Sequence, residues 1–231
     1  MVSPSAPRFA AVLFDLDGTL VDSSEDLAAA VNHARAGLGL GPLSTERVRG
    51  HIGDGMPVLL ARSLPDPALV PRAIELFRPY YAAHLLDRTR AYEGAEAALD
   101  ALAAAGVPLG VVTNKPGAFT RQILERTGLA RFFGAAVVGS DDGFGKKPER
   151  GPFDAALARL GGPPPERALM VGDGRNDVLG PRGIGMASCG VGWGIGDPAE
   201  LRALRPDYWV ERPGQLPGIV LGEAGPSGSA T

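Results

Sequence analysis

The sequence predicts an α/β fold in which a parallel sheet is interrupted near its start by a block of helices. Between residues 93 and 213, short apolar runs that end in polar residues alternate with helical segments, which is the pattern of βαβ units. Between residues 22 and 92, helical segments follow one another without a convincing strand. We therefore expect a discontinuous α/β core, 9–21 with 93–213, and an inserted, all-helical domain at 22–92.

The first strand is expected at residues 9–13, a short run of bulky apolar residues that is typical of a buried strand. Asp15 and Asp17 follow it, and residues two apart project to the same face of a strand. Two carboxylates beside a buried strand are costly unless a cation neutralises them. This stretch therefore requires a metal ion, a lysine or both.

The helical block begins after Ser23 or Ser24, either of which can cap a helix whose first turn carries acidic residues. Glycine- and proline-rich breaks separate it from further helices. These are expected from Ser44 to about residue 49, over 56–63 and over 71–86. Together they form a small helical bundle.

Strands of the predicted core end in polar residues suited to chemistry. We expect further strands at 107–112, 135–138, 168–171 and 207–210, and helices at 95–105, 119–127 and 152–160. Thr113 and Asn114 follow the second strand, and Asp173 and Asp177 follow a later one. In an open α/β sheet the carboxyl ends of the strands meet at one crevice, where ligands bind. We therefore expect these side chains to gather beside Asp15.

The composition is that of an ordinary globular protein, with 231 residues, of which 45% are hydrophobic and 21% charged. A net charge of −3 without a basic cluster argues against nucleic-acid and membrane-surface partners. No apolar run is long enough to span a bilayer, and the N-terminus lacks the pattern of a signal peptide, so we expect a cytoplasmic protein. Residues 1–8 and 222–231 are expected to be disordered.

Cysteine and lysine are both rare in this chain. The single cysteine, Cys189, rules out an intramolecular disulfide and is expected to be a small core residue. Of 23 basic residues only three are lysines, which indicates positions that need a compact ammonium. Lys147, which precedes a proline, is the favoured functional lysine. Lys146 is expected to be a bystander, whereas Lys115 either reaches the site or lies on its rim.

The predicted cluster has the chemistry of a phosphoryl-transfer site. Asp15, Asp17 and Asp173 offer oxygen ligands, which select Mg²⁺ over zinc or copper. The hydroxyl of Thr113 and the ammonium of Lys147 complete a site for a small dianion such as a phosphoryl group. One carboxylate of the first pair can attack phosphorus, and the other can protonate the leaving oxygen.

Four ordered segments, 15–23, 111–116, 147–148 and 172–177, resemble the four motifs of the haloacid dehalogenase superfamily. More narrowly, segments 52–55, 113–116, 146–148 and 172–177 resemble bacterial phosphoglycolate phosphatases. The resemblance extends from about residue 9 to 210. It implies a Rossmann-like core, with the helical block at 22–92 as a mobile cap that reads the leaving group of the substrate.

The resemblance also implies roles for individual residues. Asp15 would be the nucleophile and a Mg²⁺ ligand, and Asp17 the general acid/base that gives its backbone carbonyl to the metal. Thr113 would bind the transferring phosphoryl group, and Lys147 would neutralise it. Asp173 would ligate Mg²⁺.

Other residues complete the expected site. Asp177 would support the metal, and backbone N–H groups at the Gly18 turn would cradle the phosphoryl oxygens. Asn114 is the further core residue expected to contact substrate. A substrate that carries a carboxylate needs a cation from the cap, for which His51 and Arg62 are the candidates.

The expected function is that of a Mg²⁺-dependent phosphatase of a small phosphorylated metabolite, with 2-phosphoglycolate as the favoured substrate and an aspartyl-phosphate as intermediate. A sugar phosphomutase or a pyrophosphatase of the same superfamily, and a non-catalytic regulatory protein that binds phosphate, are the alternatives. A dehalogenase is disfavoured because Asp17 would have no leaving oxygen to protonate. A phosphonate hydrolase would need a cap lysine, and 22–92 contains none. A monomer and a homodimer are both compatible with the sequence.

The chain departs from the resembled motifs in places. Gly174 stands where Ser or Thr is usual, and Arg150 where a second proline is usual. Pro181 follows the last aspartate closely and is not expected inside a helix, which predicts a looser or shorter segment there.

Overall fold

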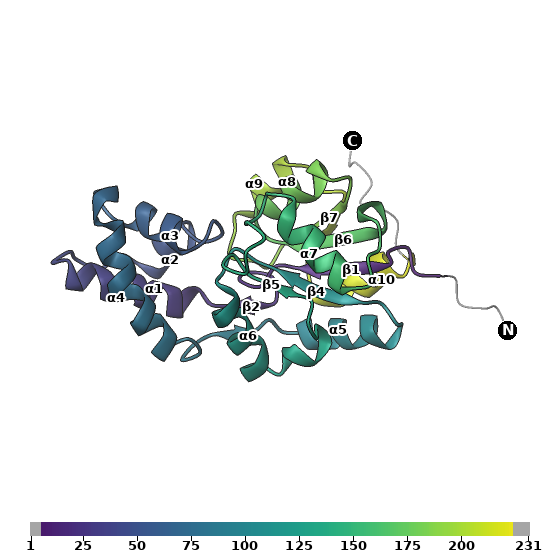
Figure 1. Cartoon of the computed structure of the whole chain (residues 1–231), viewed down its shortest axis with the longest axis horizontal. Coiled ribbons are helices and arrows are strands. Elements are labelled where there is room, and N and C mark those ends of the chain that lie inside the picture. The colour runs from purple at the N-terminus through teal and green to yellow at the C-terminus, as the bar shows by residue number, and fades with distance from the viewer. Residues whose placement is uncertain (1–5, 224–231) are drawn as a thin grey trace.

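The computed structural model of the chain describes residues 6–223. A parallel sheet with helices on both faces forms one part, and a group of four helices lies beside it (Figure 1). The two ends expected to be disordered fall mostly outside the described residues, as 1–5 and 224–231. Arg8 is described, and its backbone N–H donates to Val220 O at 2.9 Å, so the chain is already ordered there.

The sheet has six parallel strands in the order β5-β4-β1-β6-β7-β8. Their bounds are Ala11–Phe14 (β1), Leu109–Val112 (β4), Val137–Val138 (β5), Ala168–Gly172 (β6), Ala187–Val191 (β7) and Tyr208–Val210 (β8). The first strand, β1, lies between β4 and β6, so the chain adds strands first on one side of β1 and then on the other. This is the arrangement in which ligands bind beyond the carboxyl ends of the central strands.

Successive side chains of the first strand belong alternately to two separate hydrophobic clusters, one on each face of the sheet. Val12 and Phe14 belong to one cluster, and Ala11 and Leu13 belong to the other. The first cluster is covered by α5 (Ala95–Ala104), α6 (Gly117–Arg126) and α10 (Leu216–Val220), and the second mainly by α7 (Gly151–Arg159). The remaining core helices are α8 (Asn176–Gly183) and α9 (Pro198–Ala203). A sheet buried on both faces explains why its strands are continuously apolar.

The inserted helices are α1 (Ser24–Gly37), α2 (Thr45–Arg49), α3 (Met56–Ser63) and α4 (Val70–Ala83), which we call the cap. Helix α1 packs against α2 and α4, and α3 packs against α4. Two short antiparallel strands, β2 (Val21–Asp22) and β3 (Arg90–Ala91), carry the chain into and out of the cap. Four short 3₁₀ turns lie at Pro67–Leu69, Leu129–Phe132, Pro165–Arg167 and Pro213–Gln215. No helix within 6–223 is long and apolar enough to cross a membrane.

The fold class is confirmed, but several details differ from the sequence-based expectation. Strands β2, β3 and β7 were not expected: the first two are only two residues long, and β7 lies in a glycine-rich stretch. Contrary to expectation, Pro181 lies inside α8; the helix is only eight residues long, and the proline removes one backbone N–H donor from it. The core extends beyond residue 213, since Leu216 and Val220 of α10 are buried. The expectation that Cys189 is a small core residue is confirmed, since it is only 1% exposed; burial raises the pKa of its thiol.

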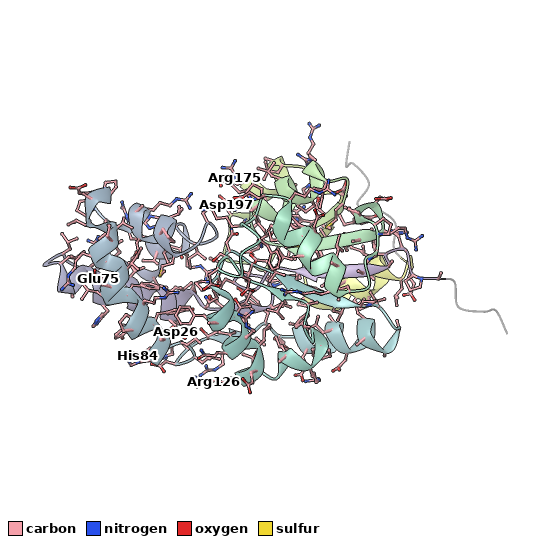
Figure 2. The ribbon with its side chains drawn as sticks, viewed as in Figure 1. Asp26, Glu75, His84, Arg126, Arg175 and Asp197 are labelled. Carbon is pink, nitrogen blue, oxygen red and sulfur yellow. The ribbon has the colours of Figure 1, made fainter. Side chains whose placement is uncertain are left out.

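Asp26 anchors the first cap helix to the strand that leaves the cap (Figure 2). The carboxylate is buried and accepts hydrogen bonds from Arg88 N, Thr89 N and Thr89 Oγ1, at distances between 2.7 and 3.1 Å. Within residues 6–223 these donors have no other hydrogen-bond partner, so this side chain, together with the pairing of β2 with β3, holds α1 to the segment that leaves the cap.

We predict that Asp26→Ala lowers the free energy of unfolding by about 3 kcal/mol, because it leaves several buried donors unsatisfied. Urea unfolding followed by circular dichroism measures the effect. The matched control is Glu25→Ala, an exposed residue of the same helical turn, which we expect to change stability by less than about 1 kcal/mol. Equal effects of the two substitutions would contradict this account.

Candidate active site

The ends of β1, β4 and β6 bring the predicted polar residues together. The chain remains paired just beyond β1, where Asp15 N donates to Val171 O at 2.9 Å, and beyond β4, where Thr113 N donates to Val138 O at 3.0 Å. The side chains of Asp15, Thr113 and Asp173 are all buried at this edge of the sheet. The expected convergence of the strand ends is therefore present.

Lys147 lies at the centre of the carboxylate group. Its Nζ is 2.9 Å from Asp15 Oδ1 and 2.6 Å from Asp177 Oδ1, and its side chain is only 1% exposed. Asp15 Oδ1 also accepts from Leu16 N at 2.7 Å, and Asp177 Oδ2 accepts from Gly174 N at 3.0 Å. Burial by itself lowers the pKa of Lys147, but the charges of the two carboxylates outweigh it and raise the pKa. Lys147 therefore stays an ammonium.

Asp173 is held by the glycine-rich segment that follows β7. Its Oδ2 accepts from Ile195 N and Gly196 N, each at 2.9 Å, and its Oδ1 accepts from Thr19 Oγ1 at 3.0 Å. A Cβ atom on Gly18 would lie 2.0 Å from Asp173 Oδ2, and one on Gly194 only 2.2 Å from Asp173 Cβ. These glycines are needed because the backbone approaches the carboxylate too closely for any side chain.

A metal ion fits this group of residues. Oxygens of Asp15, Asp173 and Asp177 all lie within 4.8 Å of one another. Burial raises the pKa of Asp173 to about 6, and repulsion by the charge of Asp15 is the second cause of this shift. Three buried carboxylates face the single ammonium of Lys147, and the excess negative charge matches a divalent cation held by oxygen ligands.

The carboxylate of Asp17 is not part of that group. It forms an ion pair with Lys115, whose Nζ is 2.9 Å from each of its oxygens. Ser23, which precedes α1, donates its hydroxyl to Asp17 Oδ1 instead of capping the helix. Burial alone lowers the pKa of Lys115, but the charge of Asp17 outweighs it and raises the pKa. Of the four predicted metal ligands, the structure gathers the carboxylates of three.

Thr113 and Asn114 lie between the two lysines. Thr113 Oγ1 accepts from Lys115 N at 3.3 Å. Asn114 Nδ2 donates to Gly53 O in the cap and to Lys147 O, each at 3.1 Å. Its other polar atom, Asn114 Oδ1, is buried and has no hydrogen-bond partner among the described residues. Both predictions that place these residues at the site agree with their positions.

Two hollows meet at Asp15 and Asp17. The first, which we call the apolar cavity, has a volume of about 40 Å³ and lies between the cap and the end of β4. Its walls include Met56, Leu59 and Phe77. The second, which we call the polar cleft, is lined by Lys147, Asp173, Asp177, Arg49, Arg62 and Arg175. Arg175 and Asp197, both labelled in Figure 2, are exposed residues of this cleft.

The two predicted cap residues differ in position. The His51 ring lies within the cap, where Nδ1 is 2.9 Å from Ser63 Oγ, and lines neither hollow. Burial, together with the nearby arginines, lowers the pKa of His51. Arg62 does line the polar cleft, but its guanidinium is engaged with Asp54 at 2.6 Å. The structure therefore brings Arg62, and not His51, to the edge of the site.

Sequence reasoning missed the contacts that join cap and core. Asp54 accepts from Asn176 Nδ2 at 2.7 Å, and Arg49 Nη2 donates to Gly194 O at 3.3 Å. Lys115, which the sequence left undecided, reaches the site itself. The scarcity of lysine was a usable signal for Lys115, whereas nothing in the sequence marked the pairing of Asp54 with Asn176.

Comparison with known proteins places the chain among enzymes of one family. The family model of haloacid dehalogenase-like hydrolases matches residues 12–191. A phosphoglycolate phosphatase of Chromobacterium violaceum is 41% identical over 200 residues, which cover 84% of this chain and 89% of that protein. A phosphoglycolate phosphatase of Neisseria meningitidis is 38% identical over 219 residues, covering 90% and 91% of the two chains.

Solved structures agree with the sequence matches. The crystal structure of a predicted phosphoglycolate phosphatase from Haemophilus somnus 129PT superimposes with a TM-score of 0.84 at 30% identity. The match covers 92% of this chain and 98% of that one. With the buried carboxylates and lysine at the strand ends, these similarities show that the chain belongs to the family of haloacid dehalogenase-like hydrolases.

Proposed function

We propose that the chain is a Mg²⁺-dependent phosphatase that hydrolyses a small phosphate monoester through an aspartyl-phosphate on Asp15. One observation carries the proposal: the buried Lys147 ammonium contacts both Asp15 and Asp177 within a carboxylate group able to hold a metal ion. Such an arrangement neutralises a phosphoryl dianion beside a carboxylate nucleophile.

In the first step, Asp15 attacks phosphorus, and the bond between phosphorus and the leaving oxygen breaks. Leu16 N and Lys147 Nζ hold Asp15 Oδ1, which supports Oδ2 as the attacking atom. The Thr113 hydroxyl orients the phosphoryl group, and Lys147 offsets its charge. Asp17 donates a proton to the leaving oxygen, so that an alcohol departs.

In the second step, a water molecule attacks the phosphorus of the aspartyl-phosphate, and its proton passes to Asp17. Inorganic phosphate leaves, and the carboxylate of Asp15 is regenerated. The position of Asp17 supports this division of labour, because it borders the apolar cavity, which Asp173 and Asp177 of the metal group do not. The acid/base group would thus meet the leaving group of the substrate.

We propose Mg²⁺ as the bound metal, held by Asp15, Asp173 and Asp177 and by the backbone carbonyl of Asp17. The all-oxygen donor set supports a hard cation. When bound, the ion polarises the phosphoryl oxygens and offsets their developing charge.

We further propose 2-phosphoglycolate as the substrate, with glycolate and phosphate as products. The names of the two relatives support it, and so does the small size of the apolar cavity, which suits a short leaving group. The cap is proposed to span residues 22–92. A cytoplasmic location, and the choice between a monomer and a homodimer, stay predictions.

A substrate panel tests the proposal. Purified protein with Mg²⁺ is offered 2-phosphoglycolate, ethyl phosphate, hexose phosphates and pyrophosphate, and phosphate release and sugar isomerisation are both measured. We expect the highest kcat/KM for 2-phosphoglycolate. Isomerised sugar phosphate without free phosphate would identify a phosphomutase, and no reaction with any compound would overturn the proposal.

Asp15→Asn is expected to reduce phosphate release by at least about a thousandfold, because the amide oxygen is a poor nucleophile. Initial rates with saturating 2-phosphoglycolate and Mg²⁺ measure the loss. The control is Asp100→Asn on α5, whose side chain is 58% exposed, and it should keep wild-type activity. An Asp15→Asn enzyme with more than a tenth of the wild-type rate would refute the assignment.

Asp173→Asn is expected to raise the Mg²⁺ concentration for half-maximal activity at least about tenfold, since one charged ligand is lost. Titration of Mg²⁺ into EDTA-treated enzyme measures it, and calorimetry reports the same change in metal affinity without turnover. Asp197→Asn provides the control, because Asp197 is an acidic residue of the same cleft outside the metal group. Unchanged metal affinity of Asp173→Asn would argue against this ligand set.

A further inference from the structure

The apolar cavity contains a single basic side chain among the described residues that line it, and this is Lys115. Lys115 comes from the core, directly after β4, and only 4% of its side chain is exposed. Its Nζ lies 2.9 Å from both oxygens of Asp17 and 4.9 Å from the centre of the Tyr81 ring in α4. The Lys115 ammonium therefore lies between a carboxylate of the core and an aromatic ring of the cap.

Two buried polar groups border the same cavity. Tyr81 is 1% exposed, and its hydroxyl makes no hydrogen bond of standard geometry within 6–223, although it lies close enough to the Lys115 ammonium to interact with it. Asn114 Oδ1, described above, has no hydrogen-bond partner there. Buried polar atoms are rarely left unsatisfied. The Tyr81 hydroxyl can donate to an anion bound in the cavity, whereas the amide oxygen of Asn114 only accepts and needs a donor such as water.

The other cations near the site line the other hollow. Arg49 and Arg62 border the polar cleft and not the apolar cavity, whereas Asp17 borders both. Each of the three cations has a carboxylate partner, Asp22, Asp54 and Asp17 respectively for Arg49, Arg62 and Lys115. A leaving group that enters the apolar cavity therefore meets Lys115 and neither arginine.

We propose that Lys115 binds the anionic end of the leaving group and so determines the specificity of the enzyme for a short carboxylate-bearing phosphate ester. The Tyr81 hydroxyl donates a second hydrogen bond to the same carboxylate. This inference rests on the proposed function and moves the substrate-binding cation from the cap, where sequence reasoning placed it, to the core.

The walls of the cavity favour this kind of ligand. Leu59, Phe77 and Phe119 exclude water, and an ion pair is stronger in such surroundings than in solvent. The same walls offer few partners to the hydroxyl groups of a sugar, whose burial without hydrogen bonds is unfavourable. A short anionic leaving group thus gains from the lysine, whereas a long polyhydroxylated one does not.

The test compares 2-phosphoglycolate with ethyl phosphate, which has the same chain length but no carboxylate. Lys115→Met is expected to reduce the preference for 2-phosphoglycolate, as the ratio of the two kcat/KM values, by about 10- to 100-fold. Any displacement of Asp17 slows both substrates, so the ratio isolates the contact with the carboxylate. Lys146→Met, an exposed lysine of a neighbouring loop, is the control and should leave the ratio unchanged.

A second variant keeps the ion pair of Lys115 with Asp17 intact. Tyr81→Phe removes only the hydroxyl and retains the ring that packs edge-on against Phe119 at 5.3 Å. We expect its KM for 2-phosphoglycolate to rise about 3- to 10-fold, with that for ethyl phosphate unaltered. If neither variant changes the ratio, Lys115 does not bind the leaving group and the inference is overturned.

Binding measurements separate this inference from the proposed function. Calorimetry on the Asp15→Asn protein with Mg²⁺ compares the affinities for 2-phosphoglycolate and ethyl phosphate, with and without Lys115→Met. A preference for 2-phosphoglycolate that disappears with Lys115→Met supports the inference even if the wild-type protein hydrolyses neither ester. Equal affinities for the two esters in the Asp15→Asn protein overturn it, even if the wild-type protein is an active phosphatase.

Discussion

Three buried carboxylates around one buried ammonium form the constraint on which the rest of the structure depends. Asp15, Asp173 and Asp177 lie close enough to share a cation, and Lys147 alone does not balance them. Such a group is costly in a folded interior unless it binds positive charge. The parallel sheet makes it unavoidable, since β1 and β6 are neighbours whose carboxyl ends coincide. A feature that is unfavourable for folding thus becomes a group of side chains able to hold a metal ion.

The two buried lysines pair with different aspartates of the segment that follows β1. Lys147 pairs with Asp15 and lines the polar cleft, whereas Lys115 pairs with Asp17 and lines the apolar cavity. The cap supplies apolar side chains and the ring of Tyr81 to the apolar cavity, and charged residues such as Arg49 and Arg62 to the polar cleft. Contacts such as Asp54 with Asn176 tie the cap to the segment that carries Asp177. Movement of the cap would therefore change the surroundings of both hollows.

The sequence was sufficient for the fold class and for the gathering of Asp15, Thr113 and Asp173, because both follow from strand–helix alternation and the geometry of parallel sheets. The sequence did not predict β7, which lies in a glycine-rich stretch. Gly194 and Gly196, which follow this strand, allow the backbone to approach Asp173 closely, and no local pattern reveals that contact. The surroundings of the two candidate cap cations could not be predicted either, since His51 and Arg62 have partners within the cap that depend on how its helices pack.

The sequence by itself determined the chemical character of the site: oxygen ligands at successive strand ends, and lysine retained at only three positions. Only the tertiary structure decided which lysine meets which aspartate. Lys115 is 98 residues from Asp17, and Lys147 is 30 residues from Asp177, so neither pairing is visible in local spacing. Strand order and the packing of the cap on the core bring these groups within hydrogen-bond distance. They also form the cavity in which the charge of Lys115 becomes available to a substrate.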